Sequence, residues 1–159
     1  ETNEVVKGTA LDICAPVEGE IKPLSAVNDP TFAQEIMGKG VAIYPSNGTF
    51  VSPVKGTIQM IFDTKHAIGI KSEEGVEILI HVGLDTVNLK GEHFETLVNV
   101  HDKVEIGTPL LKVDLEAIQK AGYDIITPMI ITNTIEYNDI ISLTEGNTHP
   151  KETVIKVVK

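Results

Sequence analysis

The sequence contains one cysteine, no tryptophan and no long apolar run, and each of these absences excludes a class of protein. A single cysteine, Cys14, can form neither an intramolecular disulfide nor a cysteine-rich zinc site, which favours a reducing cytoplasm. Aromatic residues make up 4% of the chain, too few for the stacking platforms of a pure sugar-binding protein. Apolar runs fall far short of the roughly 20 residues that a membrane-spanning helix needs, and the first residues lack a signal-peptide pattern. The sequence therefore predicts a cytoplasmic protein with no membrane span of its own.

Positive charge is scarce and arginine is missing altogether. The chain has 13 basic residues against 23 acidic ones, a net charge of -10, and every basic residue is lysine. Arginine is the main bidentate donor for guanine and phosphate, and nucleic acids and anionic membranes both bind through basic patches. The composition therefore argues against both as partners and favours a basic protein partner.

The features that are present indicate one all-β domain spanning residues 1–159. Hydrophobic residues make up 42% of the chain, enough for one core at this length. Short β-branched runs are separated by Gly, Pro, Asn or Asp, as in strands joined by turns. Three connectors look helical: residues 28–37, 94–98 and 115–121. Strands are expected at residues 4–7, 11–14, 17–22, 40–45, 49–52, 56–61, 66–71, 76–82, 103–106, 109–114, 127–132 and 153–158.

One short pattern occurs twice. Residues 15–21 and 52–58 both read as a small residue, Pro, Val, any residue, Gly, any residue and Ile, and a similar turn runs through Val104, Gly107 and Pro109. Proline can begin a strand where no ladder donor is needed, and glycine permits a bulge or tight bend. Repeated turns of this kind favour an antiparallel β-sandwich or flattened barrel.

Two of the five histidines stand in strand patterns that a hairpin signal joins. His66 begins one run, His81 closes the next, and the polar residues 72–75 lie between them. A loop with an even number of residues pairs His66 directly with His81, with about 4.5–5.5 Å between their Cβ atoms. An odd loop shifts the register by one and places them on opposite faces. The other three histidines lie in polar loop sequence and are expected to be solvated.

Other polar groups lie close to this pair in the sequence. Thr64 lies two residues before His66, on the same face of an extended strand, where its hydroxyl would orient the imidazole. Beyond His81, Gly83 allows close backbone approach and Asp85 adds a carboxylate. Because imidazole titrates near neutrality, this ensemble predicts a chemical site. The competing interpretation is that one or both histidines are satisfied, partly buried core residues.

Two sequence blocks enclose the histidines: Phe-Asp-Thr-Lys-His-Ala at residues 62–67, and Leu-Ile-His-Val-Gly-Leu-Asp-Thr at residues 79–86, with Leu-Lys-Gly at residues 89–91. Together they resemble the glucose-specific IIA family of the bacterial phosphoenolpyruvate-dependent sugar phosphotransferase system. The resemblance implies an antiparallel β-sandwich with Greek-key and jelly-roll features and a few short helical connectors. It extends to residues 15–21, 38–43, 52–58 and 127–133.

The resemblance also implies a chemistry. His81 would be transiently phosphorylated, with HPr as the donor and the IIB domain of a glucose-type permease as the acceptor, so that the membrane is reached only through the permease. His66 would donate a hydrogen bond to the phosphoryl oxygens, and Thr64 would position His66. The backbone carbonyl near Gly83 would hold the other ring nitrogen of His81. No cofactor is implied.

A partner-binding rim is implied around the same histidines. Asp29 and Asp85 match family positions that meet a basic residue of HPr, and Phe32, Phe62 and Val87 match the apolar surround. A carrier that docks two proteins in turn needs a modest apolar ring rather than a deep pocket.

The alternative function is a zinc-dependent hydrolase on a related sandwich, with the two histidines as metal ligands. Such sites need three convergent ligands, commonly including a His-x-His pair, and residue 83 is Gly. Incidental zinc binding by His66 and His81 stays open where a partner supplies a carboxylate. A biotin or lipoate carrier would need a lysine at a hairpin tip, and residues 72–75 contain none.

Overall fold

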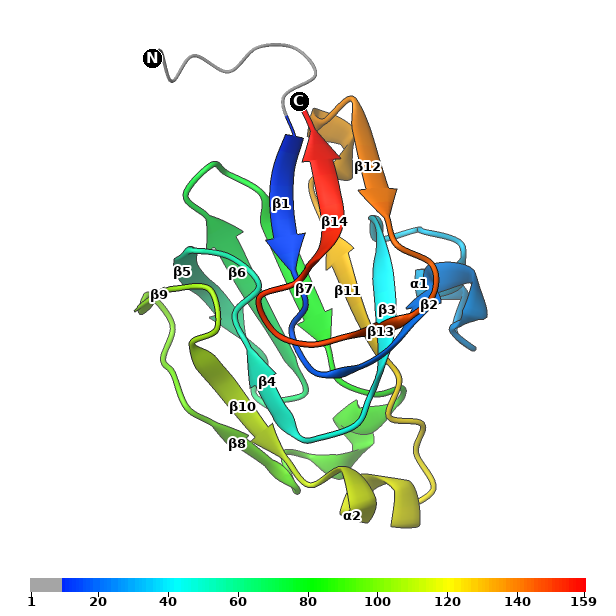
Figure 1. The fold of residues 1–159 in the computed structure, drawn as a ribbon. Helices are drawn as coiled ribbons and strands as arrows, with labels where there is room; N and C mark the ends of the chain where they lie inside the picture. Colours follow the sequence, from blue (N-terminus) through cyan, green and yellow to red (C-terminus); the bar gives the residue numbers. More distant parts are fainter. Residues whose placement is uncertain (1–9) are drawn as a thin grey trace.

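The computed structural model describes residues 10–159, which form strands joined by turns and short helices (Figure 1). The predicted strand at residues 4–7 lies outside this range. The described strands are β1 (Ala10–Cys14), β2 (Gly19–Pro23), β3 (Lys39–Pro45), β4 (Thr49–Val51), β5 (Gly56–Ile61), β6 (Ala67–Ser72), β7 (Glu77–His81), β8 (Phe94–Thr96), β9 (Lys103–Val104), β10 (Pro109–Val113), β11 (Thr127–Ile131), β12 (Asp139–Ser142), β13 (Asn147–Thr148) and β14 (Thr153–Val158).

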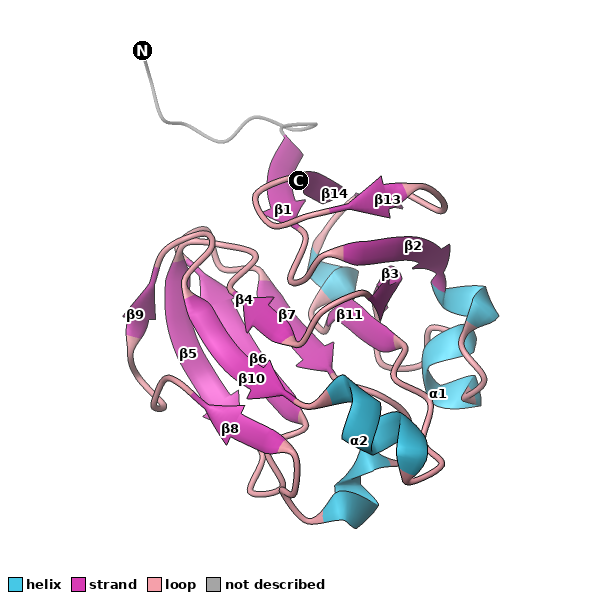
Figure 2. Cartoon of the chain, turned by 60° about the horizontal axis from the view of Figure 1, so that its bottom comes forward, coloured by secondary structure: helices cyan, strands magenta, loops and turns pink. Residues whose placement is uncertain are grey.

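These strands form three antiparallel sheets. The largest has the order β13-β2-β3-β11-β7-β6-β5-β9, and two smaller ones have the orders β4-β10-β8 and β1-β14-β12. None of the sheets within the described range closes into a barrel, so the sandwich is confirmed and the flattened barrel is not formed. Both α-helices lie at the margin of the strands (Figure 2).

The short helices differ in part from expectation. The helix α2 (Leu115–Lys120) is confirmed, with Asp114 accepting from the Ala117 N–H at its first turn. The helix α1 (Pro30–Ala33) is much shorter than the predicted residues 28–37, because Glu35 takes a left-handed φ of 59°. The sequence did not predict the strands β12 and β13 or the three 3₁₀ turns, which are η1 (Leu24–Ala26), η2 (Thr86–Leu89) and η3 (Thr134–Glu136).

The predicted helix at residues 94–98 is wrong. Phe94 begins the strand β8 and pairs with Val113 of β10, which buries its ring. A cross-strand partner and a core position therefore override the local helical pattern.

The large sheet carries a different apolar cluster on each face. Alternation along β7 sends Ile78 and Ile80 into the main core and Leu79 into a smaller cluster on the other face. His81 follows the parity of Leu79 and points to the same side. The smaller cluster consists of Leu24, Val27, Phe32, Ala42, Ala67, Leu79, Leu84, Ile126 and Ile130.

The repeated Pro-Val-x-Gly pattern forms two equivalent turns that bind each other. In each copy the backbone bends over three residues, 16–18 and 53–55, and the following glycine is the first residue of a strand. Gly19 begins β2 and Gly56 begins β5. The Cys14 N–H donates to the Pro53 carbonyl and the Val51 N–H to the Pro16 carbonyl. The repeat is therefore structural, because the residue just before each copy donates a backbone hydrogen bond to the proline of the other copy.

No helix within residues 10–159 is long and apolar enough to cross a membrane.

Candidate functional site

His66 lies in a tight turn that precedes the strand β6. The Lys65 N–H donates to the Phe62 carbonyl at 2.8 Å, the Phe62 N–H donates to the Ala67 carbonyl at 3.0 Å, and Lys65 takes a left-handed φ of 64°. Thr64 Oγ1 lies 2.7 Å from His66 Nδ1. The predicted contact of the hydroxyl with the imidazole is present, and a turn rather than an extended strand makes it.

His81 ends the strand β7, one residue away from the predicted register. Its opposite residue is Ala67, and the Val82 N–H donates to the His66 carbonyl at 2.7 Å. The Ser72 N–H donates to the Val76 carbonyl at 2.9 Å, which closes the hairpin around an odd number of loop residues, 73–75, with Gly75 at a left-handed φ of 97°. A three-residue hairpin loop with a left-handed glycine is a common form, and it shifts the pairing by one.

The two imidazoles nevertheless meet. Their ring centroids are 4.7 Å apart and their planes are inclined by 81°. If both residues were in paired strands, the alternation of side chains would place them on opposite faces of the sheet. His66 lies before Ala67, the first paired residue of β6, so its side chain does not have to follow that alternation. The expected proximity is confirmed, and the direct pairing from which we derived it is wrong.

A backbone carbonyl determines which nitrogen of His81 carries the proton. His81 Nδ1 lies 2.8 Å from the Gly83 carbonyl oxygen. Because a carbonyl only accepts, the neutral ring must hold its proton on Nδ1, which leaves the lone pair on Nε2. The ring is partly exposed, whereas the side chain of His66 behind it is only 2% exposed.

Burial lowers the pKa of both rings and so favours their neutral forms near pH 7. Burial, together with the neighbouring His81, lowers the pKa of His66 to about 4. Burial also lowers the pKa of His81, against the opposing effects of the Gly83 carbonyl and the carboxylates of Asp29 and Asp85. A neutral, partly exposed imidazole with a free lone pair can act as a nucleophile.

Aromatic and apolar side chains surround the pair. The centroids of the Phe32 and His81 rings are 5.0 Å apart. The centroids of the Phe62 and His66 rings are 5.3 Å apart, and these two rings meet edge to face. Phe32 is held by α1, whose first turn is capped by the Asp29 carboxylate at 3.0 Å from the Thr31 N–H. The structure therefore brings Asp29, Phe32 and Phe62 to the histidines.

The remaining predicted rim residues follow His81 in the chain. Asp85 is exposed at a left-handed φ of 60°, and Val87 in η2 is 48% exposed. Sequence reasoning missed the apolar floor of the site, which includes Leu79 and Ile130, although the alternation in β7 already puts Leu79 on the face of His81.

Sequence reasoning also missed the segment that holds the loop after His81. The Gly83 N–H donates to the Ile126 carbonyl and the Leu84 N–H to the Asp124 carbonyl. These residues are about forty positions away in the chain, so no local signal could have indicated them.

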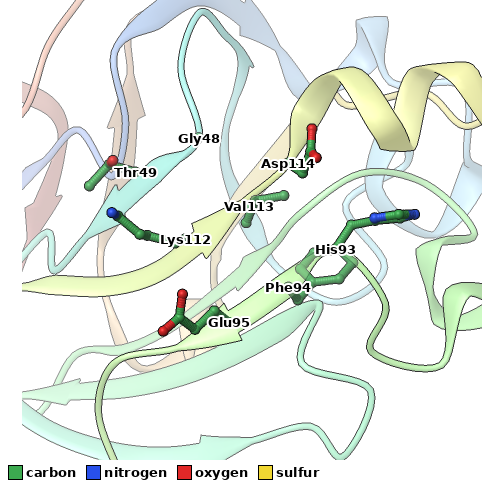
Figure 3. A pocket seen from close by; sticks show the side chains of 8 residues that line it. All are labelled: Gly48, Thr49, His93, Phe94, Glu95, Lys112, Val113 and Asp114. Atoms are coloured by element: carbon green, nitrogen blue, oxygen red, sulfur yellow. The ribbon is translucent and has the colours of Figure 1, made fainter.

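Nothing in the described part of the chain favours the hydrolase alternative. No three side chains of His, Cys, Asp or Glu within residues 10–159 converge to hold a metal ion. A hollow of about 520 Å³ lies elsewhere, between β4, β8 and β10, and is lined by His93, Glu95, Lys112 and Asp114 (Figure 3). It includes neither residue of the histidine pair.

Comparison with known proteins identifies the family of the chain. The family model of the phosphoenolpyruvate-dependent sugar phosphotransferase system, EIIA 1, matches residues 11–137. The PTS system beta-glucoside-specific EIIBCA component of Bacillus subtilis (strain 168) is 50% identical over 151 residues, which are 95% of this chain and 25% of that protein. The glucose permease IIA from Mycoplasma capricolum superposes with a TM-score of 0.85 at 36% identity, covering 93% of this chain and 96% of that one.

The chain thus spans about a quarter of the length of the curated relative, and nearly the whole of the solved IIA structure. The match to the family model includes the turn of His66, the strand of His81 and the loop that follows it. The chain belongs to the EIIA 1 family of the phosphoenolpyruvate-dependent sugar phosphotransferase system, a component that takes part in phosphoryl transfer.

Proposed function

We propose that this domain is a cytoplasmic phosphocarrier that holds a phosphoryl group on Nε2 of His81. It would receive the group from phospho-HPr and pass it to the IIB domain of a sugar permease. One observation carries the proposal: His81 Nδ1 is bound to the Gly83 carbonyl at 2.8 Å, so that the lone pair of the neutral ring lies on Nε2 of a partly exposed side chain.

The chemistry needs little besides this nitrogen. The Nε2 lone pair forms a bond to phosphorus while the bond from phosphorus to the donor breaks, and the donor keeps that electron pair. As Nε2 forms its fourth bond, positive charge develops on the ring, and the Gly83 carbonyl stabilises the Nδ1–H. Transfer to IIB is the same step in the opposite direction, with His81 as the leaving group.

His66 is suited to stabilise the transferring group. If Thr64 donates its hydroxyl hydrogen to His66 Nδ1, the neutral His66 ring carries its proton on Nε2 and can donate it to a phosphoryl oxygen. Its low pKa does not weaken this role, because a neutral imidazole N–H is a donor. His66 is therefore assigned as the hydrogen-bond donor and Thr64 as its positioning residue.

The surface around His81 suits two successive protein partners. Phe62 and Val87 supply partly exposed apolar surface, and the buried Phe32 ring packs against His81. Asp29 and Asp85 add carboxylates that would attract a basic partner. A IIB acceptor is supported by the name of the Bacillus subtilis relative, which joins EIIB, EIIC and EIIA in one component. An HPr donor is inferred from membership of the EIIA family.

The test is phosphoryl transfer with purified components. The chain is incubated with phosphoenolpyruvate, enzyme I and HPr, and its intact mass is followed for one acid-labile phosphoryl group. We expect labelling of the wild type and none of His81→Gln. His66→Ala should accept the group but transfer it onward to IIB roughly 10²-fold more slowly, the usual cost of losing one transition-state donor.

His93→Gln is the matched control. It makes the same change as His81→Gln at an exposed histidine in the hollow of Figure 3, and it should behave as the wild type. An unlabelled wild type in the presence of active phospho-HPr would refute the carrier function. Labelling of His81→Gln would refute the assignment of the acceptor residue.

A further inference from the structure

The Gly83 carbonyl is the group that selects the tautomer of His81, so whatever holds that carbonyl controls the nucleophile. Gly83 takes a left-handed φ of 78°, and a Cβ at this position would lie 2.6 Å from Thr86 Cγ2 and 2.8 Å from the Asp124 carbonyl oxygen. The turn therefore has no room for a side chain at residue 83, because Thr86 and the Asp124 backbone fill the space around the glycine.

The two peptide planes on either side of Gly83 are each anchored at both ends. In the plane between Gly83 and Leu84, the Leu84 N–H donates to the Asp124 carbonyl at 3.0 Å, and the Gly83 carbonyl accepts from His81 Nδ1. The N–H and C=O of a trans peptide point in opposite directions. Holding the N–H against Asp124 therefore aims the carbonyl at His81.

The preceding plane, between Val82 and Gly83, is anchored in the same way. The Gly83 N–H donates to the Ile126 carbonyl at 3.1 Å, and Thr86 Oγ1 donates to the Val82 carbonyl at 2.6 Å. Apart from His81, Thr86 is the residue that contributes a side chain to this set of four hydrogen bonds; the other groups are backbone.

The environment makes this hydroxyl hard to replace. Thr86 and Val82 are both 0% exposed. If the hydroxyl is removed, water cannot easily reach the Val82 carbonyl, and a buried carbonyl without a partner is unfavourable. The plane between Val82 and Gly83 would then rotate toward another donor, and the Gly83 carbonyl would move with it.

We infer that Thr86 is a positioning residue for phosphoryl transfer: its buried hydroxyl fixes the turn at Gly83 and thereby holds His81 in the tautomer with a free Nε2. This inference rests on the proposed function of His81. The tautomer itself can be measured without any phosphoryl donor, so the two claims can be tested separately.

The experiment compares Thr86→Val, which keeps the shape and removes the hydroxyl, with Thr86→Ser, which keeps the hydroxyl. Ring ¹⁵N chemical shifts of His81 report the tautomer in the unphosphorylated chain. We expect the Nδ1–H form in the wild type, a mixture of both tautomers in Thr86→Val, and recovery in Thr86→Ser. The rate of labelling by phospho-HPr should fall about tenfold in Thr86→Val, as expected for a misplaced nucleophile.

Thr148→Val is the matched control for stability. Thr148 is also a buried threonine that donates its hydroxyl, to Glu152 Oε1 at 3.0 Å, but it lies in β13. It should lower the melting temperature without changing the tautomer. If Thr86→Val keeps the wild-type tautomer and rate, the inference about Thr86 is wrong. If the tautomer shifts but even the wild type takes no phosphoryl group, the positioning role stands and the carrier function fails.

Discussion

His66 is unusual at the scale of the single residue because it is a titratable group that the fold keeps neutral. Its side chain is almost fully buried between the edge of the Phe62 ring and the ring of His81, and its one resolved polar contact is the Thr64 hydroxyl. Protonation would place a charge in this apolar setting beside a second imidazole. Both effects lower the pKa of His66 to about 4.

This shift makes stability depend on pH in a defined direction. The pKa of His66 is about 4 in the folded chain and about 6.5 in the unfolded chain, so the unfolded chain binds more protons between these values. Stability is therefore fully present above pH 6.5 and falls as the pH drops toward 4. The loss assigned to His66 is about 3 kcal/mol of unfolding free energy.

Denaturant unfolding at pH 7.5 and pH 4.5 measures this loss. His66→Gln is the comparison, because glutamine cannot titrate while every other ionisable group stays in place. The drop in unfolding free energy between the two pH values should be smaller in the variant by roughly 2 kcal/mol or more. Equal drops in both proteins would show that His66 is not buried in its neutral form.

At the scale of the element, very short segments place the side chains of the site. The helix α1 has four residues, Pro30–Ala33, yet it sets the Phe32 ring against His81. A helix of this length cannot be stable alone, so its N-cap matters. Asp29 supplies that cap, and its charge also acts on His81.

Two substitutions at residue 29 separate the cap from the charge. Asp29→Ala removes both and should cost about 1 kcal/mol of unfolding free energy. Asp29→Asn keeps a good cap, so it should cost less than about 0.5 kcal/mol, but it should lower the pKa of His81 because the carboxylate that raises it is gone. Thermal unfolding and NMR titration of His81 measure the two effects, and equal destabilisation by both variants would show that the cap is unimportant.

The sequence predicted some helices and strands correctly and others wrongly, depending on whether the element is specified by local residues or by its partners. The helix α2 was predicted because Gly122 marks its end and the pattern is local. The segment 94–98 was assigned to a helix wrongly, because its strand exists only through pairing with β10. The hairpin of β6 and β7 was predicted correctly, but its loop length, and hence its register, was not.

At the scale of the whole molecule, the large sheet separates stability from function. One face bears the main core, whereas the other bears the smaller cluster beneath the histidines. Leu111 in β10 extends from the small sheet β4-β10-β8 into the main core, Leu79 in β7 lies in the smaller cluster, and both are buried. Truncating a leucine should therefore affect stability alone in the main core, but both stability and the site in the smaller cluster.

Leu111→Ala and Leu79→Ala should each cost about 2–5 kcal/mol of unfolding free energy, the usual range for truncating a buried leucine. Only Leu79→Ala should also disturb the site, because its cavity lies on the face of His81. Denaturant unfolding measures the first effect, and the ring ¹⁵N shifts of His81 in the folded chain measure the second. A shift in Leu111→Ala as large as that in Leu79→Ala would contradict the separation of the two faces.

The sequence by itself determined the all-β class, the hairpin that joins the histidines, and the likeness to the IIA family, because periodicity, turn residues and short motifs are local in the chain. It also indicated His66, His81, Thr64 and the Gly83 carbonyl as a group. The geometry of that group depends on backbone that is distant in the sequence. The Asp124 and Ile126 carbonyls orient the Gly83 turn, and the turn at residue 65 releases His66 from strand alternation. Only the tertiary structure brings these segments together, since hydrogen bonds between remote backbone groups leave no pattern in the side chains.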